Sequence, residues 1–380
     1  MIVERLSSDI DIKRHLNRIG VDGGGVNILA AKSKLHIIQI RDFHVGAANI
    51  LKQDALSVGA DLAVPRGTIL AETPRVDALL IATTRALGKL AKKEKLQPFG
   101  LKGLSGKLEE ILALKAVKKV DIMGVINAND DSFFSKSRFS GEDALTIIEQ
   151  MISDGATIID IGGVSSAPNA KSVPAQEELR RIKPICDLIK EQKLFERVTF
   201  SIDSYEPVVI EYALKSGFHI VNDIRGLESD SVCEICAEYK AEVIIMHMQG
   251  RPQTMQNNPN YENLLDEVYS FLESRVKKAE SYGIENITLD VGIGFGKRLE
   301  DNLQLIKHLG HFQTLGKPLL VGASRKSMID QVSPATVEDR LGGTLAIHLE
   351  AMRNGASILR VHDVKEHAQA VKLQEALNSV

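Results

Sequence analysis

Polar side chains occur at the end of nearly every buried hydrophobic run in the last two thirds of the sequence. These end positions include Asn127, Asp160, Asp203, Asn222, Asp223, Met246, His247, Asp290, Ser324, Lys326, Arg360 and His362. A single aspartate at such a position is often a helix cap, but a whole series of runs ending in this way is hard to explain by capping. The pattern predicts one functional site to which most runs contribute a side chain.

The residue types at these ends suit a flat, nitrogen-rich ring. Asp203, Asn222 and Asp290 offer carboxylates and an amide. A carboxylate can accept two parallel N–H donors from the edge of a cyclic amidine. Lys326 adds a donor for a ring carbonyl or a ring nitrogen. We therefore expect a heterocycle with a cyclic amidine edge to bind here.

A second group of end residues suits an anion. Arg360 and His362 are two residues apart, so in a strand both side chains would point to the same face. Together with Asn127 they could hold an anion such as diphosphate, with Mg2+ bridging its oxygens. The alternative is that Arg360 and His362 lie at the surface with their hydrogen bonds satisfied, and bind no ligand.

Eight short apolar runs alternate with helical stretches from about residue 120 onward, at 120–127, 156–162, 198–203, 219–224, 242–247, 287–292, 318–324 and 358–363. Each is rich in Val, Ile and Leu at both alternating positions, as expected of parallel strands buried on both faces. Eight βα units in about 260 residues fit a closed (β/α)8 TIM barrel, whose sites lie at the carboxyl ends of the strands. A doubly wound open sheet is the alternative, and the count of eight favours the barrel.

The first 118 residues do not follow this alternation and predict a small α/β domain. Strands are expected at 26–31, 36–42 and 61–67, and helices near 45–58 and 76–96. The glycine-containing segment 98–119 is interpreted as a connector leading into one more helix. The predicted domains are residues 1–118, whose role the sequence does not define, and residues 119–380, the barrel.

Composition excludes several classes of protein. With 380 residues, a formal net charge of −3 and no tryptophan, the chain offers no basic face or aromatic platform for nucleic acid or an anionic membrane. No apolar run approaches the roughly 18 residues that span a bilayer, and the charged N-terminus is unlike a signal peptide. We therefore expect a cytoplasmic protein. Cys233 and Cys236 form a CxxC without a second ligand pair nearby, and we interpret them as core residues of a helix.

Nine segments of the barrel region, taken together and in order, resemble the signatures of the dihydropteroate synthase family. They are MGVINANDDSF (123–133), DIGGVSSAP (160–168), SIDSY (201–205), NDIRG (222–226), MHMQGRPQTMQ (246–256), LDVGIGFGK (289–297), LLVGASRKS (319–327), DRLGGTLA (339–346) and RVHDV (360–364). The resemblance implies a transferase of folate biosynthesis. Its substrates would be 6-hydroxymethyl-7,8-dihydropterin diphosphate and p-aminobenzoate, with Mg2+ as cofactor.

The resemblance also assigns roles to individual residues. It implies a pterin pocket of Asp203, Asn222, Met246, Asp290, Phe295, Gly322 and Lys326. It implies a p-aminobenzoate site with Ser166, Pro168 and Ser327, and a diphosphate site with Asn127, Arg360 and His362, in which Asn127 is also the metal ligand. The implied catalytic residues are Asp131, Asp203, Lys326, Arg360 and His362.

The implied mechanism is ionisation at the methylene carbon of the pterin. Mg2+, Arg360 and His362 neutralise the departing diphosphate, and Asp203 offsets the charge of the pterin cation. The aniline nitrogen of p-aminobenzoate then attacks, so no strong enzymic base is required. The resemblance also implies a homodimer.

Two loops depart from the family pattern. The first reads NDDSF (129–133) where the family reads close to Thr-Pro-Asp-Ser-Phe, and losing the proline frees φ at position 130. In the second loop Val164 replaces an acid and Ala167 replaces an arginine, so one charge of each sign is lost. Because that loop forms part of the p-aminobenzoate site, the sequence leaves open which residue does the work of the missing arginine.

Other functions remain open from the sequence. A pterin-dependent methyltransferase would share Asp203, Asn222 and Asp290 but has no use for a diphosphate clamp. A pterin-binding paralogue without synthase activity is kept open by Ala167. The N-terminal extension resembles that of bifunctional dihydropteroate synthase/dihydropteroate reductase fusions, which would add FMN as a hydride carrier. The triple glycine at 23–25 could bind its phosphate, although such a run is more often a flexible turn, and the extension could instead serve dimerisation or stability.

Overall fold

The computed structural model describes all residues except 8–9, 115–116, 129–141, 166–171 and 379–380. The chain forms two compact units, Met1–Lys115 and Ala116–Ser379. Each has its own hydrophobic core. No helix in the described part of the chain is long and apolar enough to cross a membrane.

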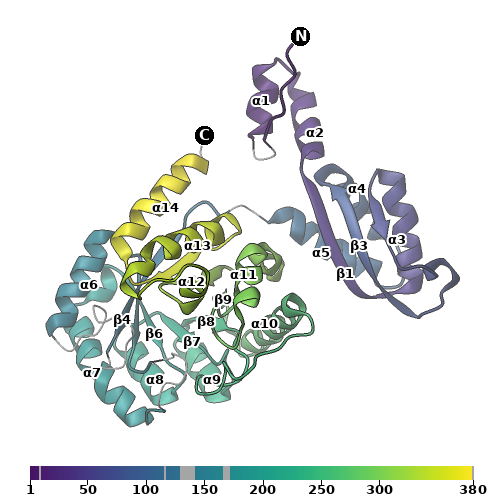
Figure 1. Cartoon of the computed structure of the whole chain (residues 1–380). Helices are drawn as coiled ribbons and strands as arrows, with labels where there is room; N and C mark the ends of the chain where they lie inside the picture. The colour runs from purple at the N-terminus through teal and green to yellow at the C-terminus, as the bar shows by residue number, and fades with distance from the viewer. Residues whose placement is uncertain (8–9, 115–116, 129–141, 166–171, 379–380) are drawn as a thin grey trace. The chain divides into compact units, whose positions relative to one another are not determined.

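Parallel strands of the second unit close into a barrel in the order β10-β11-β4-β5-β6-β7-β8-β9 (Figure 1). The strands are β4 (Asp121–Asn127), β5 (Ile158–Gly162), β6 (Thr199–Asp203), β7 (Ile220–Asp223), β8 (Glu242–Met246), β9 (Ile287–Asp290), β10 (Leu319–Val321) and β11 (Ile358–Val361). Each lies within one of the predicted runs. The closed order confirms the TIM barrel, and the doubly wound open sheet is wrong.

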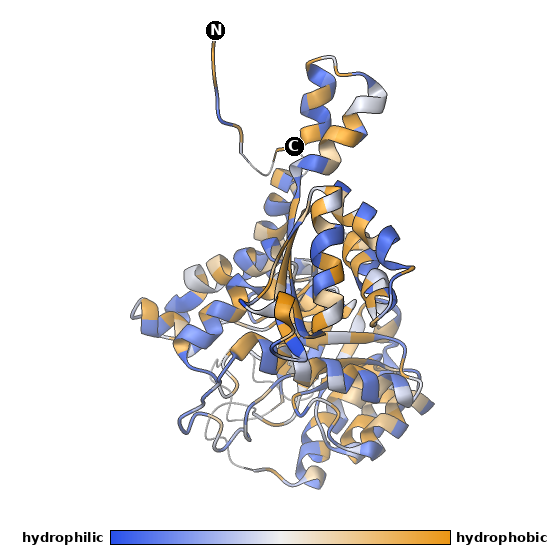
Figure 2. Cartoon of the chain, turned by 90° about the vertical axis from the view of Figure 1, so that its right-hand side faces the viewer, coloured by the Kyte–Doolittle hydropathy of each residue, from blue (hydrophilic) through white to orange (hydrophobic). Residues whose placement is uncertain are grey.

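Amphipathic helices surround the barrel strands. They are α6 (Glu142–Asp154), α7 (Ala175–Glu191), α8 (Pro207–Lys215), α9 (Asp230–Glu238), α10 (Leu264–Ser281), α11 (Leu299–Lys307), α12 (Ser327–Val332), α13 (Leu341–Arg353) and α14 (Val364–Asn378). Figure 2 shows hydrophobic and hydrophilic residues side by side along these helices, and their apolar faces join the main core. Cys233 and Cys236 lie buried in α9, which confirms their interpretation as core residues.

A smaller apolar cluster fills the inside of the barrel. It consists of Met123, Ile158, Ile220, Ile244, Leu320 and Ile358. Side chains alternate between the two faces of a strand, so a residue two positions further on points to the same inner side. On five of these six strands that residue is Asp160, Asn222, Met246, Gly322 or Arg360. The apolar cluster therefore forms the floor beneath a largely polar mouth.

The first unit contains an antiparallel three-stranded sheet in the order β1-β3-β2. Its elements are α1 (Ile12–Arg18), α2 (Gly23–Ser33), β1 (Leu35–His44), α3 (Val45–Val58), β2 (Asp61–Ala63), β3 (Arg75–Thr83), α4 (Thr84–Glu94) and α5 (Leu101–Ala113). Leu51 of α3, Leu80 of β3 and Leu87 of α4 meet in its core. The predicted strand at 36–42 and helix at 45–58 are confirmed.

Other predictions for this unit are wrong. Residues 26–31 lie in helix α2, not in a strand, because Asp22 caps that helix by accepting the N–H of Gly24 at 2.9 Å. The triple glycine is accordingly the first turn of α2. Residues 76–83 form β3, not the start of a helix, since buried and exposed residues alternate along it with a period of two. The predicted strand at 61–67 shortens to β2.

Candidate active site

One arginine joins two carboxylates at the mouth of the barrel. Arg360 on β11 donates from Nε to Oδ2 of Asp160 at 2.7 Å and from Nη2 to Oδ2 of Asp203 at 2.6 Å. Asn222 donates from Nδ2 to the same Asp160 oxygen at 3.2 Å. The other oxygen of Asp160 is buried without a hydrogen-bond partner among the described residues. Side chains from four strands are thus linked in one polar cluster at the barrel mouth.

Burial changes the protonation of these groups. It raises the pKa of Asp203 to about 7, with Asp160 adding to the effect and Arg360 opposing it. Burial also raises the pKa of Asp290, although the N–H of Gly292 donates to its Oδ1 at 2.7 Å. For Arg360, burial would lower the pKa, but the two carboxylates raise it above the ordinary value. The guanidinium therefore remains charged between its partners.

Lys326 and Phe295 contact each other near this cluster, and Lys326 interacts electrostatically with Arg360, Asp290 and Asp203. The Nζ atom of Lys326 lies 4.2 Å from the centroid of the Phe295 ring, within cation–π distance. Burial, and then the charge of Arg360, lower the pKa of Lys326 to about 8. Phe295 packs with Met246 and Met255 in a small apolar cluster. The barrel mouth therefore brings together an apolar surface, a cation and carboxylates, as a flat polar ring requires.

Asn127 ends β4 on the same inward side, and Gly162 leaves the space beside it open. A Cβ atom at Gly162 would lie 3.8 Å from Oδ1 of Asn127 and 3.7 Å from Oδ2 of Asp203, so both oxygens face this space. In the described part of the chain, no group of three or more His, Cys, Asp or Glu side chains could hold a metal ion. The amide oxygen of Asn127 is a hard oxygen donor, and Mg2+ in proteins is commonly bound by one or two such side-chain oxygens together with substrate phosphates.

His362 follows β11 and contacts the loop after β10. Its Nδ1 lies 2.9 Å from Oγ of Ser324, and its backbone N–H donates to the same oxygen at 3.3 Å. Burial, and then the charge of Arg360, lower the pKa of His362 to about 4, so the imidazole is neutral at pH 7. The alternative of a surface pair for RVHD is wrong, because Arg360 and His362 are both partly buried at the mouth.

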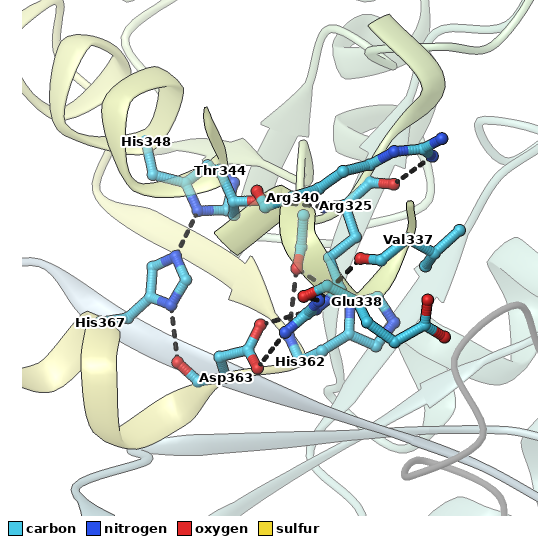
Figure 3. A network of polar contacts seen from close by, with 10 residues as sticks. Arg325, Val337, Glu338, Arg340, Thr344, His348, His362, Asp363 and His367 are labelled. Atoms are coloured by element: carbon cyan, nitrogen blue, oxygen red, sulfur yellow. Dashed lines mark hydrogen bonds and ion pairs between the residues drawn. The ribbon is translucent and has the colours of Figure 1, made fainter. Parts of the chain in front are cut away.

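A second arginine, Arg325, directly precedes Lys326 and makes a network of contacts (Figure 3). Arg325 donates from Nε and Nη2 to the two carboxylate oxygens of Asp363, at 2.9 and 2.7 Å. Its Nη1 donates to the carbonyls of Val337 and Glu338, at 2.7 and 2.6 Å. The backbone of Arg325 is left-handed, with φ of 56°, a conformation that non-glycine residues rarely adopt. The side-chain bonds hold this turn in place.

Two buried histidines extend the same network (Figure 3). The N–H of Ala323 donates to Nε2 of His348 at 3.1 Å, so Nε2 is the acceptor nitrogen. Nδ1 of His348 must then carry the hydrogen and donate to Nε2 of His367 at 2.9 Å. Nδ1 of His367 in turn donates to the carbonyl of Asp363 at 2.6 Å. One backbone amide thereby fixes both tautomers and ties the β10 loop to the end of β11.

The structure also contains a buried lysine, Lys297, for which the sequence predicts no role. Nζ of Lys297 lies 2.9 Å from Nδ1 of His247 and donates to the carbonyls of His247 and Phe295, at 3.3 and 3.0 Å. Burial lowers its pKa to about 7. Lys297 belongs to a motif already noted, GFGK, but only the fold reveals its partner. It ties the loop after β8 to the loop that carries Phe295.

Not every predicted site residue can be placed. Asp131, Ser166 and Pro168 lie outside the described residues. Ser327 is exposed at the first position of α12. Gly322 lies beside Arg360, where a Cβ atom would be 3.6 Å from the Cβ of the arginine.

Comparison with known proteins agrees with this geometry. A family model described as pterin binding enzyme matches residues 123–362. The bifunctional dihydropteroate synthase/dihydropteroate reductase of Helicobacter pylori is 43% identical over 377 residues, covering 99% of both chains. The dihydropteroate synthase of Haemophilus influenzae is 43% identical over 258 residues, covering 67% of this chain and 93% of the relative. The chain belongs to the dihydropteroate synthase family.

A solved structure supports the same assignment. The Yersinia pestis dihydropteroate synthase in complex with a sulfonamide drug matches with a TM-score of 0.66 and 37% identity, covering 70% of this chain and 96% of that one. This synthase is therefore a transferase of folate biosynthesis, and the matches favour it over a pterin-dependent methyltransferase. The family resemblance of the sequence is confirmed.

Proposed function

We propose that the barrel mouth of this synthase contains three neighbouring subsites. The pterin subsite comprises Asp203, Asn222, Asp290 and Lys326, lined by Met246, Phe295 and Gly322. The diphosphate subsite comprises Asn127, Arg360 and His362, and the p-aminobenzoate subsite comprises Ser327 with Ser166 and Pro168. Asp131 is the remaining proposed catalytic residue. The observation that carries the proposal is the Arg360 bridge between Asp160 and Asp203.

Pterin binding would exchange one hydrogen-bond donor for another at Asp203. The carboxylate of Asp203 accepts Nη2 of Arg360 at 2.6 Å. A pterin presents parallel N–H donors of the kind that a carboxylate accepts in pairs. When these donors take over Asp203, Arg360 keeps Asp160 as its partner and its Nη2 becomes available for the diphosphate. Arg360 thereby connects occupancy of the pterin subsite to stabilisation of the leaving group.

Arg360 and His362 donate hydrogen bonds to the departing diphosphate. The hydroxyl of Ser324 accepts the backbone N–H of His362 and, in the tautomer that this role requires, donates its own hydrogen to Nδ1. The imidazole then carries its proton on Nε2, as a neutral donor for a phosphate oxygen. Donors held in place before charge develops stabilise the transition state. Asn127 offers its amide oxygen to Mg2+, which, when bound, offsets the charge of the diphosphate.

After diphosphate leaves, the cationic pterin stays next to Asp203. This carboxylate offsets the positive charge while the aniline nitrogen attacks the methylene carbon. The nitrogen loses its proton readily after attack, so the site requires no strong base. The support from the structure is that Asp203 and Asn127 face one space, which brings the acid close to the proposed diphosphate subsite.

Pterin binding to variants tests these roles. Fluorescence titration with 6-hydroxymethylpterin should show Asp290→Asn binding at least tenfold more weakly, since hydrogen bonds to charged groups contribute about 1.5–3 kcal/mol each. Arg360→Met should lower kcat for diphosphate release more than it weakens pterin binding. Arg353→Met removes an exposed cation at the end of α13 and is the matched control. Unchanged pterin affinity in Asp290→Asn would contradict the assignment.

We further propose that the chain reduces dihydropteroate with FMN. The support is the 43% identity to a bifunctional synthase/reductase, which extends over 99% of both chains and so includes the N-terminal unit. The triple glycine does not fit a phosphate, because the carboxylate of Asp22 already accepts the N–H of Gly24 and would repel an anion. We therefore assign no residues to FMN. Flavin absorption in the purified protein supports this function, and a colourless protein that does not take up FMN contradicts it.

We also infer a cytoplasmic homodimer, on the basis of the family resemblance. The subunit mass is 41.6 kDa. Sedimentation equilibrium should therefore give a species of twice that mass. A single species of subunit mass at micromolar concentration would contradict the dimer.

A further inference from the structure

A cavity of about 780 Å³ opens beside Lys326 and Ser327. Its lining includes Asn258, Lys297, Arg298, Glu300, Lys326 and Ser327. These residues come from the loop after β8, from the loop after β9 with the start of α11, and from the loop after β10 with the start of α12. The cavity is thus walled by three loops at the carboxyl end of the barrel.

The chemistry of the reaction indicates that p-aminobenzoate lies between the pterin subsite and this cavity. Lys326 borders both the proposed pterin subsite, where it lies over Phe295, and the cavity. The amine of p-aminobenzoate joins the pterin methylene, and its carboxylate is at the opposite end of the ring. A substrate that enters past Lys326 therefore directs its carboxylate into the cavity, away from the acids of the barrel mouth.

Three cationic side chains line the cavity, and two of them, Lys297 and Lys326, already contact other groups of the protein. Lys297 is 3% exposed, and its ammonium group is shared among His247 Nδ1 and two backbone carbonyls. Lys326 is the partner of Phe295 and the proposed pterin donor. Arg298 is exposed on the wall.

The guanidinium of Arg298 has further N–H groups that can donate to a carboxylate. Within the described part of the chain it donates one side-chain hydrogen bond, from Nη2 to Oδ1 of Asn258 at 3.2 Å. A guanidinium group has five N–H donors in a planar fork that matches a carboxylate. Glu300 also lines the cavity and opposes an anion there, so a cation on this wall is needed to offset it.

We infer that Arg298 binds the carboxylate of p-aminobenzoate and selects this substrate over uncharged anilines. The inference rests on the proposed p-aminobenzoate subsite. The family's second loop has an arginine where this chain has Ala167. Arg298 would take the place of that missing cation. In this chain the cation that recognises the carboxylate comes from the loop after β9.

Steady-state kinetics with two anilines tests the inference. The substrates are p-aminobenzoate and 4-aminobenzamide, which replaces the carboxylate with a neutral amide. Arg298→Met should raise KM for p-aminobenzoate roughly tenfold, the loss expected for a charge-assisted hydrogen bond at a partly solvated site. KM for the pterin diphosphate, kcat, and kcat/KM for 4-aminobenzamide should stay within twofold of the unaltered enzyme.

Two further variants control for folding and for general charge effects. Arg298→Lys retains the charge and should recover part of the affinity, but not all, because lysine lacks the planar fork. Lys307→Met removes an exposed cation from the other end of α11 and should leave both anilines unaffected. In the unaltered enzyme KM for p-aminobenzoate should rise with salt, and Arg298→Met should lose that dependence.

The outcomes separate this inference from the function on which it rests. An active unaltered enzyme with an unchanged KM in Arg298→Met overturns the role of Arg298 alone. An equal loss for both anilines also overturns it, because such a loss does not depend on the carboxylate. If Arg298→Met does not fold, the salt dependence and Arg298→Lys still decide the question. An unaltered chain without turnover overturns the proposed subsites as well.

Discussion

Replacing Arg325 with methionine should destabilise the barrel strongly, although the residue lies behind the site. Its guanidinium donates two hydrogen bonds to Asp363 and one each to the carbonyls of Val337 and Glu338. The side chains of Arg325 and Asp363 are only 7% and 14% exposed. Removing one partner of a buried pair leaves the other charge uncompensated, which costs about 3–5 kcal/mol. We therefore expect Arg325→Met to lose about 4 kcal/mol of unfolding free energy.

Urea denaturation followed by circular dichroism at pH 7 measures this loss. Arg325→Lys should recover little, because lysine cannot supply the bidentate pair and the two carbonyl contacts together. The double variant Arg325→Met/Asp363→Leu should be more stable than the sum of the single changes predicts, since no buried charge remains. Because Lys326 follows Arg325 directly, Arg325→Met should also lower kcat.

Two results would refute this reasoning. A loss below about 1 kcal/mol in Arg325→Met, the range of exposed ion pairs, would mean that water replaces the guanidinium at little cost. Strict additivity in the double variant would mean that Arg325 and Asp363 do not stabilise each other.

Three further predictions follow from buried groups. Gly292→Ala should abolish synthase activity and lower the melting temperature, because its Cβ would overlap the carbonyl oxygen of His247 and φ is 69°. Burial raises the pKa of Glu94 from 4.5 to about 7, so the folded N-terminal unit holds a proton that the unfolded chain releases. Its stability to urea should fall as pH rises from about 4.5 to about 7, and Glu94→Gln should remove that dependence. His348 and His367 have lowered pKa values through burial, so the unfolded chain binds more protons in acid. Barrel stability should therefore fall below about pH 6.5, and His367→Gln should flatten this slope.

The barrel could be predicted because its signal is local. Each strand is a short run of Val, Ile and Leu, and the alternation of side chains places the polar end residues on the inner face. Asp160, Asn222 and Arg360 are each two positions beyond an apolar residue of the inner cluster. A sequence pattern with a period of two is enough to bring such residues to one mouth.

The contacts between these residues could not be predicted. Arg360 is separated by 200 residues from Asp160 and by 157 from Asp203, and no local pattern specifies which carboxylate it meets. His348 and His367 lie on two helices, and only the packing of α13 against α14 makes them a pair.

The errors in the N-terminal unit also have a physical cause. Segment 26–31 is apolar enough for a strand, but the cap at Asp22 starts a helix before it. Segment 76–83 runs directly into the helix α4, so the sequence predicts one continuous helix, although the residues of 76–83 alternate with the period of two that is typical of a strand. Local propensity therefore fails where a cap or a sheet partner decides the structure.

The most direct test of the central claim is diphosphate release by the full chain with Mg2+ and the pterin diphosphate, measured with and without p-aminobenzoate. The account predicts release that depends on p-aminobenzoate, with one dihydropteroate formed per diphosphate, and a large loss in Asp290→Asn. Tight pterin binding without any release that depends on p-aminobenzoate would contradict it and identify a pterin-binding protein without synthase activity.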